Sequence, residues 1–273
     1  FYFYKSNVWS KLDSDTRTNY KLIKSAADLA AELTAGGGSK YLLNTTTLYE
    51  INGAIALAHP IELNNAYVMG LDSAEDKLVR SGGDLFTGST GGAIKMLTLS
   101  GGKVFNLTGS AAQNLILRDL IIASSASVGS INTYGMVFMS VVQYVGNTTG
   151  ITFANINQLL ISNTGWFANN AGAYETFAGT FDFIQKQGGF MVIDGAAKGI
   201  DVSSNPSVNR AVLSGVSFSG TSAQYINRYT SGSYSGYNFN NSWTVNCPGI
   251  KLESDEVASA NIYYDGGITT GFA

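Results

Sequence analysis

The chain has 273 residues but only one cysteine, Cys247, one histidine, His59, and three prolines. A lone cysteine excludes an intramolecular disulfide and a CxxC metal site. A lone histidine excludes a metal cage built from several histidines of one chain. We expect Cys247, next to Pro248, to be a buried strand residue. The sequence therefore predicts no metal or other cofactor.

Charge is equally scarce. Charged residues make up 13% of the chain, the net charge is −3 and the pI is about 5.1. No basic run or basic-aromatic stripe occurs, so we expect no nucleic-acid partner. No stretch approaches the roughly 20 apolar residues that span a bilayer, so we expect no membrane insertion. The chain begins Phe1-Tyr-Phe-Tyr4 rather than with Met, and we expect it to be processed or incomplete.

A five-residue pattern recurs instead: apolar, any, apolar, any, then Asn, Asp or Gly. Its starts are separated by one or two units of roughly 18 to 21 residues, and short strands at such a period predict a solenoid of β-coils. Asn, Asp and Gly tolerate the positive φ of sharp corners. The occurrences are Leu97–Gly101, Leu115–Asp119, Ile151–Asn155, Phe190–Asp194 and Ala211–Gly215.

The pattern also sets the domain organisation. Residues 1–24 form a lead-in segment. Ser25-Ala-Ala-Asp28 resembles a capping box, helical spacing follows, and Gly36–Gly38 ends the element, which predicts a helix over 25–35. Such a helix would cap the open end of the core. From Tyr41 onward apolar residues alternate with period two, and no linker interrupts them, so residues 25–273 are expected to form a single domain.

These features give the chain a resemblance to a known family. The helix Ser25–Thr34, the Gly36–Gly38 break, the strand Tyr41–Leu43 and the motif Asn114–Ile122 resemble the pectate-lyase-like right-handed parallel β-helix superfamily. The likeness covers about residues 20–265 and is one of pattern. It implies an all-β, right-handed, single-stranded parallel β-helix with roughly 20 residues per coil and a short N-terminal capping α-helix.

The resemblance also implies functions. One group of the superfamily contains polysaccharide lyases and hydrolases, and another contains bacteriophage tail spikes, fibres and capsid decorations together with bacterial surface proteins. The uncharged Gly-, Ser-, Asn- and Thr-rich texture is more similar to the second group. We therefore expect a non-enzymatic structural protein of a virion or cell surface, used in assembly or host attachment. Its expected partners are two further copies in a homotrimer and other virion or surface proteins.

An enzyme that degrades polysaccharides, such as a tail-spike-type lyase or glycosidase, is the first alternative. A glycosidase needs two carboxylates about 5 to 10 Å apart. If one coil takes about 19 residues, Asp201 would lie near Asp182 or Asp194. In this alternative Asp194 is the acid and Asp201 the base. The competing interpretation makes each Asp a turn residue bonded to the nearby backbone.

Other enzyme signals are missing. The Asn-Thr-Asp, Asp-Asp, Gly-His-Gly and Arg-Ile-Lys motifs expected of polygalacturonase-like enzymes do not occur. A lyase-like site needs clustered Asp ligands for Ca²⁺ and a basic residue. Arg118 beside Asp119 and Lys186 near Asp182 form no such cluster.

A carbohydrate-binding bacterial adhesin is the second alternative. Aromatic residues are interspersed with Ser, Gly and Asn over 225–243, a composition that resembles glycan- or protein-binding faces. The competing interpretation is that these rings pack a terminal coil or a subunit interface. The candidate binding residues are Tyr225, Tyr229, Tyr234, Tyr237 and Trp243.

Overall fold

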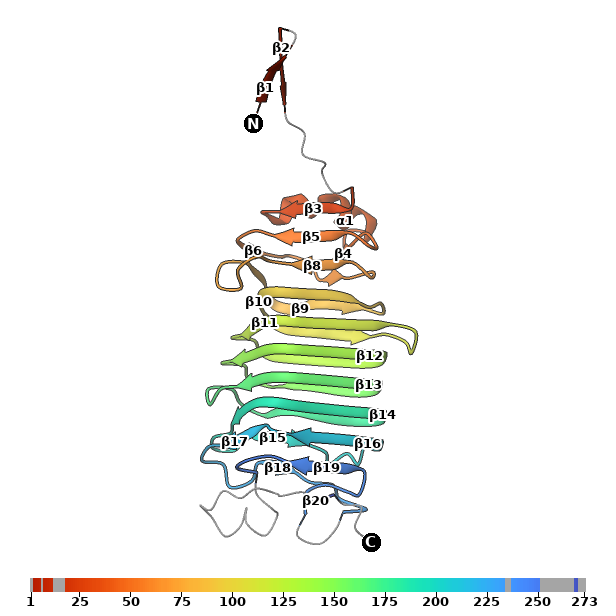
Figure 1. Cartoon of the computed structure of the whole chain (residues 1–273), viewed down its shortest axis with the longest axis vertical. Helices are drawn as coiled ribbons and strands as arrows, with labels where there is room; N and C mark the ends of the chain where they lie inside the picture. Colours follow the sequence, from red (N-terminus) through yellow and green to blue (C-terminus); the bar gives the residue numbers. More distant parts are fainter. Residues whose placement is uncertain (1, 6, 12–17, 234–236, 251–267, 270–273) are drawn as a thin grey trace.

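The computed structural model describes residues 2–5, 7–11, 18–233, 237–250 and 268–269. Within them the chain is an all-β parallel β-solenoid of about nine coils, with about 24 residues per coil and one short helix at the N-terminal end (Figure 1). The coils stack along the long axis of the molecule in chain order. This confirms the predicted fold class.

The elements follow one another as short strands at the ends and long, bent strands in the middle. In chain order they are β1 (Tyr2–Lys5), β2 (Val8–Lys11), β3 (Tyr20–Ile23), the 3₁₀ helix η1 (Ala26–Leu29), α1 (Ala30–Ala35), β4 (Tyr41–Leu42), β5 (Leu48–Ile51), β6 (Ala54–Ala56), β7 (Ile61–Glu62), β8 (Tyr67–Met69), β9 (Lys77–Gly88), β10 (Gly92–Thr108), β11 (Asn114–Ala123), β12 (Ser127–Val145), β13 (Ile151–Trp166), β14 (Ala173–Val192), β15 (Lys198–Asp201), β16 (Ser207–Ser214), β17 (Ser217–Ser219), β18 (Ile226–Asn227), β19 (Trp243–Asn246) and β20 (Ile268–Thr269).

Each central coil has three straight segments, which stack in parallel register into three sheets. In the coil that holds β12, residues 127–132 lie in sheet 1, residues 136–140 in sheet 2 and residues 142–145 in sheet 3. Alternate residues point inward and stack into columns that fill the core, each buried apolar side chain contributing about 1.5–3 kcal/mol. The inward column of sheet 2 is Tyr49, Val68, Ile94, Leu117, Met139, Ile161, Lys186, Leu213 and Val245.

Corners with positive φ separate the sheets. Asp119 (φ 53°) and Gly215 (φ 66°) lie at the corner between sheets 2 and 3, whereas Asn155 (φ 53°) lies at the corner between sheets 1 and 2. The prediction of a positive-φ corner is confirmed for Asp119, Asn155 and Gly215, whereas Gly101 and Asp194 do not have positive φ. The predicted coil of roughly 20 residues is too short, because the five-residue pattern ends at more than one kind of corner. Intervals counted between unlike corners underestimate the coil.

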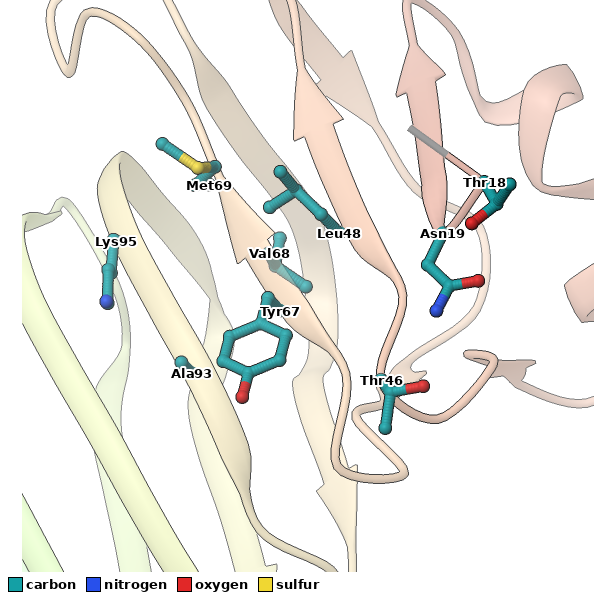
Figure 2. Close-up of a pocket in the computed structure, with 9 residues that line it drawn as sticks. All are labelled: Thr18, Asn19, Thr46, Leu48, Tyr67, Val68, Met69, Ala93 and Lys95. Atoms are coloured by element: carbon teal, nitrogen blue, oxygen red, sulfur yellow. The ribbon is translucent and has the colours of Figure 1, made fainter. Parts of the chain in front are cut away.

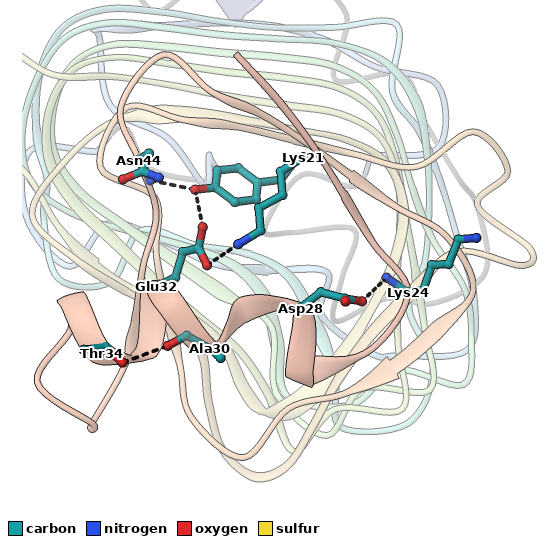
Figure 3. A network of polar contacts seen from close by, with 8 residues as sticks. Lys21, Lys24, Asp28, Ala30, Glu32, Thr34 and Asn44 are labelled. Carbon is teal, nitrogen blue, oxygen red and sulfur yellow. Dashed lines mark hydrogen bonds and ion pairs between the residues drawn. The ribbon is translucent and has the colours of Figure 1, made fainter. Parts of the chain in front are cut away.

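The helix predicted over 25–35 is confirmed as η1 followed by α1. The backbone N–H of Ser25 donates to Asp28 Oδ2 at 2.8 Å, as in a capping box. Glu32 is 2% exposed and accepts hydrogen bonds from Tyr49 Oη (3.0 Å) and Lys21 Nζ (2.6 Å) (Figure 3). Leu29 belongs to the core. The helix thus closes the N-terminal end of the solenoid.

Candidate functional site

Asp194 lies in the turn after β14. Its Oδ1 accepts hydrogen bonds from the backbone N–H of Thr221 (2.8 Å) and from Thr221 Oγ1 (2.9 Å). Thr221 belongs to the next coil, so the carboxylate joins two successive turns. This geometry favours the turn interpretation of Asp194 over the role of a catalytic acid.

Asp201 and Asp182 do not lie side by side. Asp201 ends β15 in sheet 1, in register with Thr176, and its Oδ1 accepts from Ser203 N (2.9 Å) and Oγ (2.7 Å). Asp182 is on sheet 2, where its Oδ1 accepts from Asn209 Nδ2 at 2.9 Å. The assumption that one coil of about 19 residues brings the two together is wrong, because the coil here is longer and puts them on different sheets.

The aromatic stretch 225–243 is mostly core. Tyr225, Tyr229 and Trp243 are at most 1% exposed. Trp243 Nε1 donates to Tyr229 Oη at 3.0 Å, and Tyr229 Oη donates to the carbonyl of Pro206 at 3.0 Å. The prediction of a glycan-binding face is therefore wrong for these three residues, because their rings pack the last coils. Tyr237 is half-buried, and Tyr234 lies outside the described residues.

Sequence reasoning missed a buried ion pair that crosses the core. Lys186 Nζ of sheet 2 lies 2.9 Å from Glu175 Oε1 of sheet 1, and both side chains are 1% exposed. Lys186 Nζ also donates to Thr164 Oγ1 at 2.7 Å. The period-two pattern held a signal, because Glu175 stands two residues before Phe177 and Lys186 two after Ile184, both core residues.

Aromatic rings stack beside this pair. Tyr144 and Trp166, in register on sheet 3, stack with ring centroids 3.7 Å apart, and Tyr174 follows Trp166 at 4.8 Å. Burial, with a smaller contribution from the charge of Glu175, raises the pKa of Tyr144 far above its usual value. These three rings are therefore buried in the core next to the ion pair, and none of them is exposed to solvent.

The outward face of sheet 2 carries a continuous uncharged column, which we call the outer ladder. Its members are in register from β3 to β19 and alternate with the inward column. They are Tyr20, Leu48, Tyr67, Ala93, Ile116, Phe138, Leu160, Gln185, Val212 and Thr244. Eight of these positions hold Tyr, Leu, Ala, Ile, Phe or Val, which is unusual for the solvent face of a sheet.

A groove lies at the N-terminal end of the outer ladder. Its lining includes Leu48 and Tyr67, which is 48% exposed. Figure 2 shows Lys95 and Asn19 on opposite sides of the Tyr67 ring. The lining residues are Thr18, Asn19, Thr46, Leu48, Tyr67, Val68, Met69, Ala93 and Lys95.

A strained corner follows sheet 2. Val141 has φ 55° and is 42% exposed, and its register places it between Asp119 and Asn163 in the corner column. A β-branched residue in the left-handed region is a genuine outlier, costing about 1–3 kcal/mol. The neighbouring coils use Asp and Asn at this place, which tolerate it better. An exposed apolar side chain is therefore held at a position that disfavours it.

Within the described ranges, no three His, Cys, Asp or Glu side chains converge where they could hold a metal ion. In the same part of the chain, none of the helices is long and apolar enough to cross a membrane. Comparison with protein-family models, curated proteins and solved structures finds no match for the chain. The candidate site is therefore defined by geometry: the outer ladder, its strained corner and its groove.

Proposed function

We propose that this protein is a structural β-solenoid that assembles with further copies of itself through the outer ladder. The observation that carries the proposal is the absence of charge at every position of that column, from Tyr20 to Thr244. An ordinary solvent-facing sheet would carry polar and charged residues there. Contiguous apolar surface on the outside of a folded protein marks an interaction site.

Symmetry explains why the missing charge favours a second copy. Where identical chains pack in parallel around an axis along the solenoid, each side chain near the axis faces its own counterpart. A charged residue would then meet a like charge, which costs several kcal/mol. Phe138 and Leu160, at the middle of the ladder, would instead meet apolar rings and methyl groups.

The size of the face is sufficient. With strands about 4.8 Å apart and about 3.3 Å per residue, the ladder and its two flanking outward columns cover about 43 by 16 Å, or about 700 Å². The ladder itself is uncharged, and the flanking columns carry Glu50, Lys95, Arg118 and Arg210. Each partner of a standard interface buries about 800 Å². Side-chain relief adds to the flat area, so the face is large enough for a stable contact.

The strained corner supports the same face. Strain of this kind persists where the side chain has a use, and the direction of inference runs from the outlier to the function. Val141 lies at the corner after sheet 2, beyond the outward column of Ser140 that flanks the Phe138 column. Its exposed methyl groups add an apolar patch on that side of the outer ladder.

The resemblance to β-helical proteins gives this assembly a context. We propose a homotrimeric spike, fibre or decoration of a virion or cell surface, contributing to assembly or host attachment. The enzyme alternative gains nothing from the geometry, since Asp182, Asp194 and Asp201 are bonded to neighbouring turns or strands. The adhesin alternative is weakened because Tyr225, Tyr229 and Trp243 are buried in the core.

The test compares matched lysine substitutions on two sheets. Leu160→Lys places a charge on the outer ladder. Thr152→Lys places the same charge on the outward face of sheet 1, in the same strand β13 and the same coil. The mass in solution is measured by light scattering after size exclusion, and folding by circular dichroism. We expect an oligomer for the wild type and Thr152→Lys, and a folded monomer for Leu160→Lys. A wild type that is monomeric at micromolar concentration, or oligomers of all three, would contradict the proposal.

A further inference from the structure

We propose that the groove at the N-terminal end of the outer ladder binds a small amphipathic anion. Such a ligand has an apolar ring or chain and a carboxylate or sulfonate group. The apolar part would lie on Leu48 and Met69 against the Tyr67 ring, and the anionic group would pair with Lys95. The groove shares Leu48, Tyr67 and Ala93 with the outer ladder, but binding of this ligand does not require self-assembly.

The shape of the groove suits a flat apolar body. Tyr67 is in register with Leu48 on one side and with Ala93 on the other, and both of these side chains are smaller than the tyrosine ring. The ring therefore stands above its neighbours and remains 48% exposed. A tyrosine exposed beside an apolar floor offers a stacking surface and one polar tip.

The charge of the groove selects an anion. Lys95 is the one charged residue among the lining residues, and none of the ion pairs found in the described part of the chain includes it. Its register neighbours in the outward column are Met69 and Arg118. Like charges directly opposite one another on adjacent strands are destabilising.

Nearby acids do not relieve this repulsion fully. Asp119 pairs with Arg118 (Nε to Oδ2, 3.0 Å), its own sequence neighbour. Glu50 lies in the same outward column as Lys95, but beyond Met69, and it accepts a hydrogen bond from Tyr20 Oη at 3.1 Å. The ammonium group of Lys95 is left beside an apolar groove without an acidic partner, which an anionic ligand would supply. A neutral ligand would leave the cation uncompensated.

The probe for the test is 1-anilinonaphthalene-8-sulfonate, an aromatic sulfonate whose fluorescence rises in apolar surroundings. It is titrated into the wild type, Lys95→Gln, Tyr67→Ser and the control Lys103→Gln. Lys103 is on the same strand, β10, but faces outward on sheet 1, in register with Asp84. Every titration is repeated in the Leu160→Lys background, so that a groove covered by assembly is distinguished from a groove that does not bind.

We expect one saturable site per chain with a dissociation constant on the order of 10–100 µM. Lys95→Gln should weaken binding about five-fold, and Tyr67→Ser by at least as much, while Lys103→Gln changes nothing. Added salt should weaken binding to the wild type and leave the remaining binding of Lys95→Gln unchanged. Equal binding by Lys95→Gln and Lys103→Gln, or no saturable binding in either background, overturns the proposal. If the wild type does not self-assemble but binds the probe as described, the binding site is supported and the assembly proposal is contradicted.

Discussion

The central outward columns of sheets 1 and 2 belong to the same coils, yet they have opposite character. In register with one another, the outward residues of sheet 1 are polar: Glu62, Thr87, Asn106, Ser130, Thr152, Thr176, Asp201 and Asn227. The matching column of sheet 2 is the uncharged, mostly apolar outer ladder. Both sheets cover the same core, so packing of the core does not account for the difference. This difference is the basis of our proposal that a partner covers the outer ladder of sheet 2.

The inward faces of the two sheets, by contrast, resemble each other. Both are apolar columns, except at one coil, where sheet 1 contributes Glu175 and sheet 2 contributes Lys186. Two ions removed from water are stable only when each satisfies the other. The interior thus joins the two sheets at a point that fixes their relative register, because a shift of either strand would separate the charges.

The largest effect is expected from breaking this link. Lys186→Met leaves Glu175 buried without its cation and should lower the free energy of unfolding by about 3–5 kcal/mol. Urea unfolding followed by circular dichroism measures the loss. Lys103→Met, outward on sheet 1, is the control and should change little.

A double variant tests whether the loss of stability comes from a buried charge without its partner. In the double variant Glu175→Leu with Lys186→Met, no charge is left without a partner, and most of the lost stability should return. A single Lys186→Met as stable as the wild type would show that the two sheets are not linked through these charges.

A smaller effect is expected at the strained corner after sheet 2. Val141→Asn relieves the left-handed strain at φ 55° and should raise the free energy of unfolding by about 1 kcal/mol. The reciprocal control, Asn163→Val at the same corner of the next coil, should lower it by about the same amount. If the proposed interface uses Val141, the stabilised variant should also assemble less tightly. If Val141→Asn were no more stable than the wild type, strain at Val141 would no longer support the proposed interface.

The smallest effect at neutral pH comes from the inward tyrosines. Burial raises the pKa of Tyr134 to about 12, and burial with the charge of Asp194 does the same for Tyr174. A raised tyrosine pKa contributes stability that is complete below the unfolded value near 10. That contribution is lost as the pH rises through about 12.

Alkaline titration measures this contribution. Phenolate absorbance of the inward tyrosines should appear only together with loss of the β-sheet circular dichroism signal. Tyr134→Phe should reduce that late step by the signal of one tyrosine. If all tyrosines ionised in one step near pH 10 while the fold stayed intact, the inward rings would be open to water.

Much of the fold could be read from local residues. Period-two alternation identified the strands, Asp119, Asn155 and Gly215 marked corners, and Ser25 and Asp28 marked the start of the capping helix. These signals are local because they depend on the backbone preferences of a residue and its near neighbours. The candidate site was harder to predict from the sequence. The residues chosen for the enzyme and adhesin alternatives are held in turns or in the core.

The sequence by itself determined that this protein is a parallel β-solenoid with a helical cap, because alternation and corner residues act over a few positions. Only the tertiary structure decided which residues are neighbours along the axis. That depends on how many residues each coil uses at its corners, which no local period records. The outer ladder, the Glu175–Lys186 pair and the groove at Lys95 all arise from that register, and so does the proposed function.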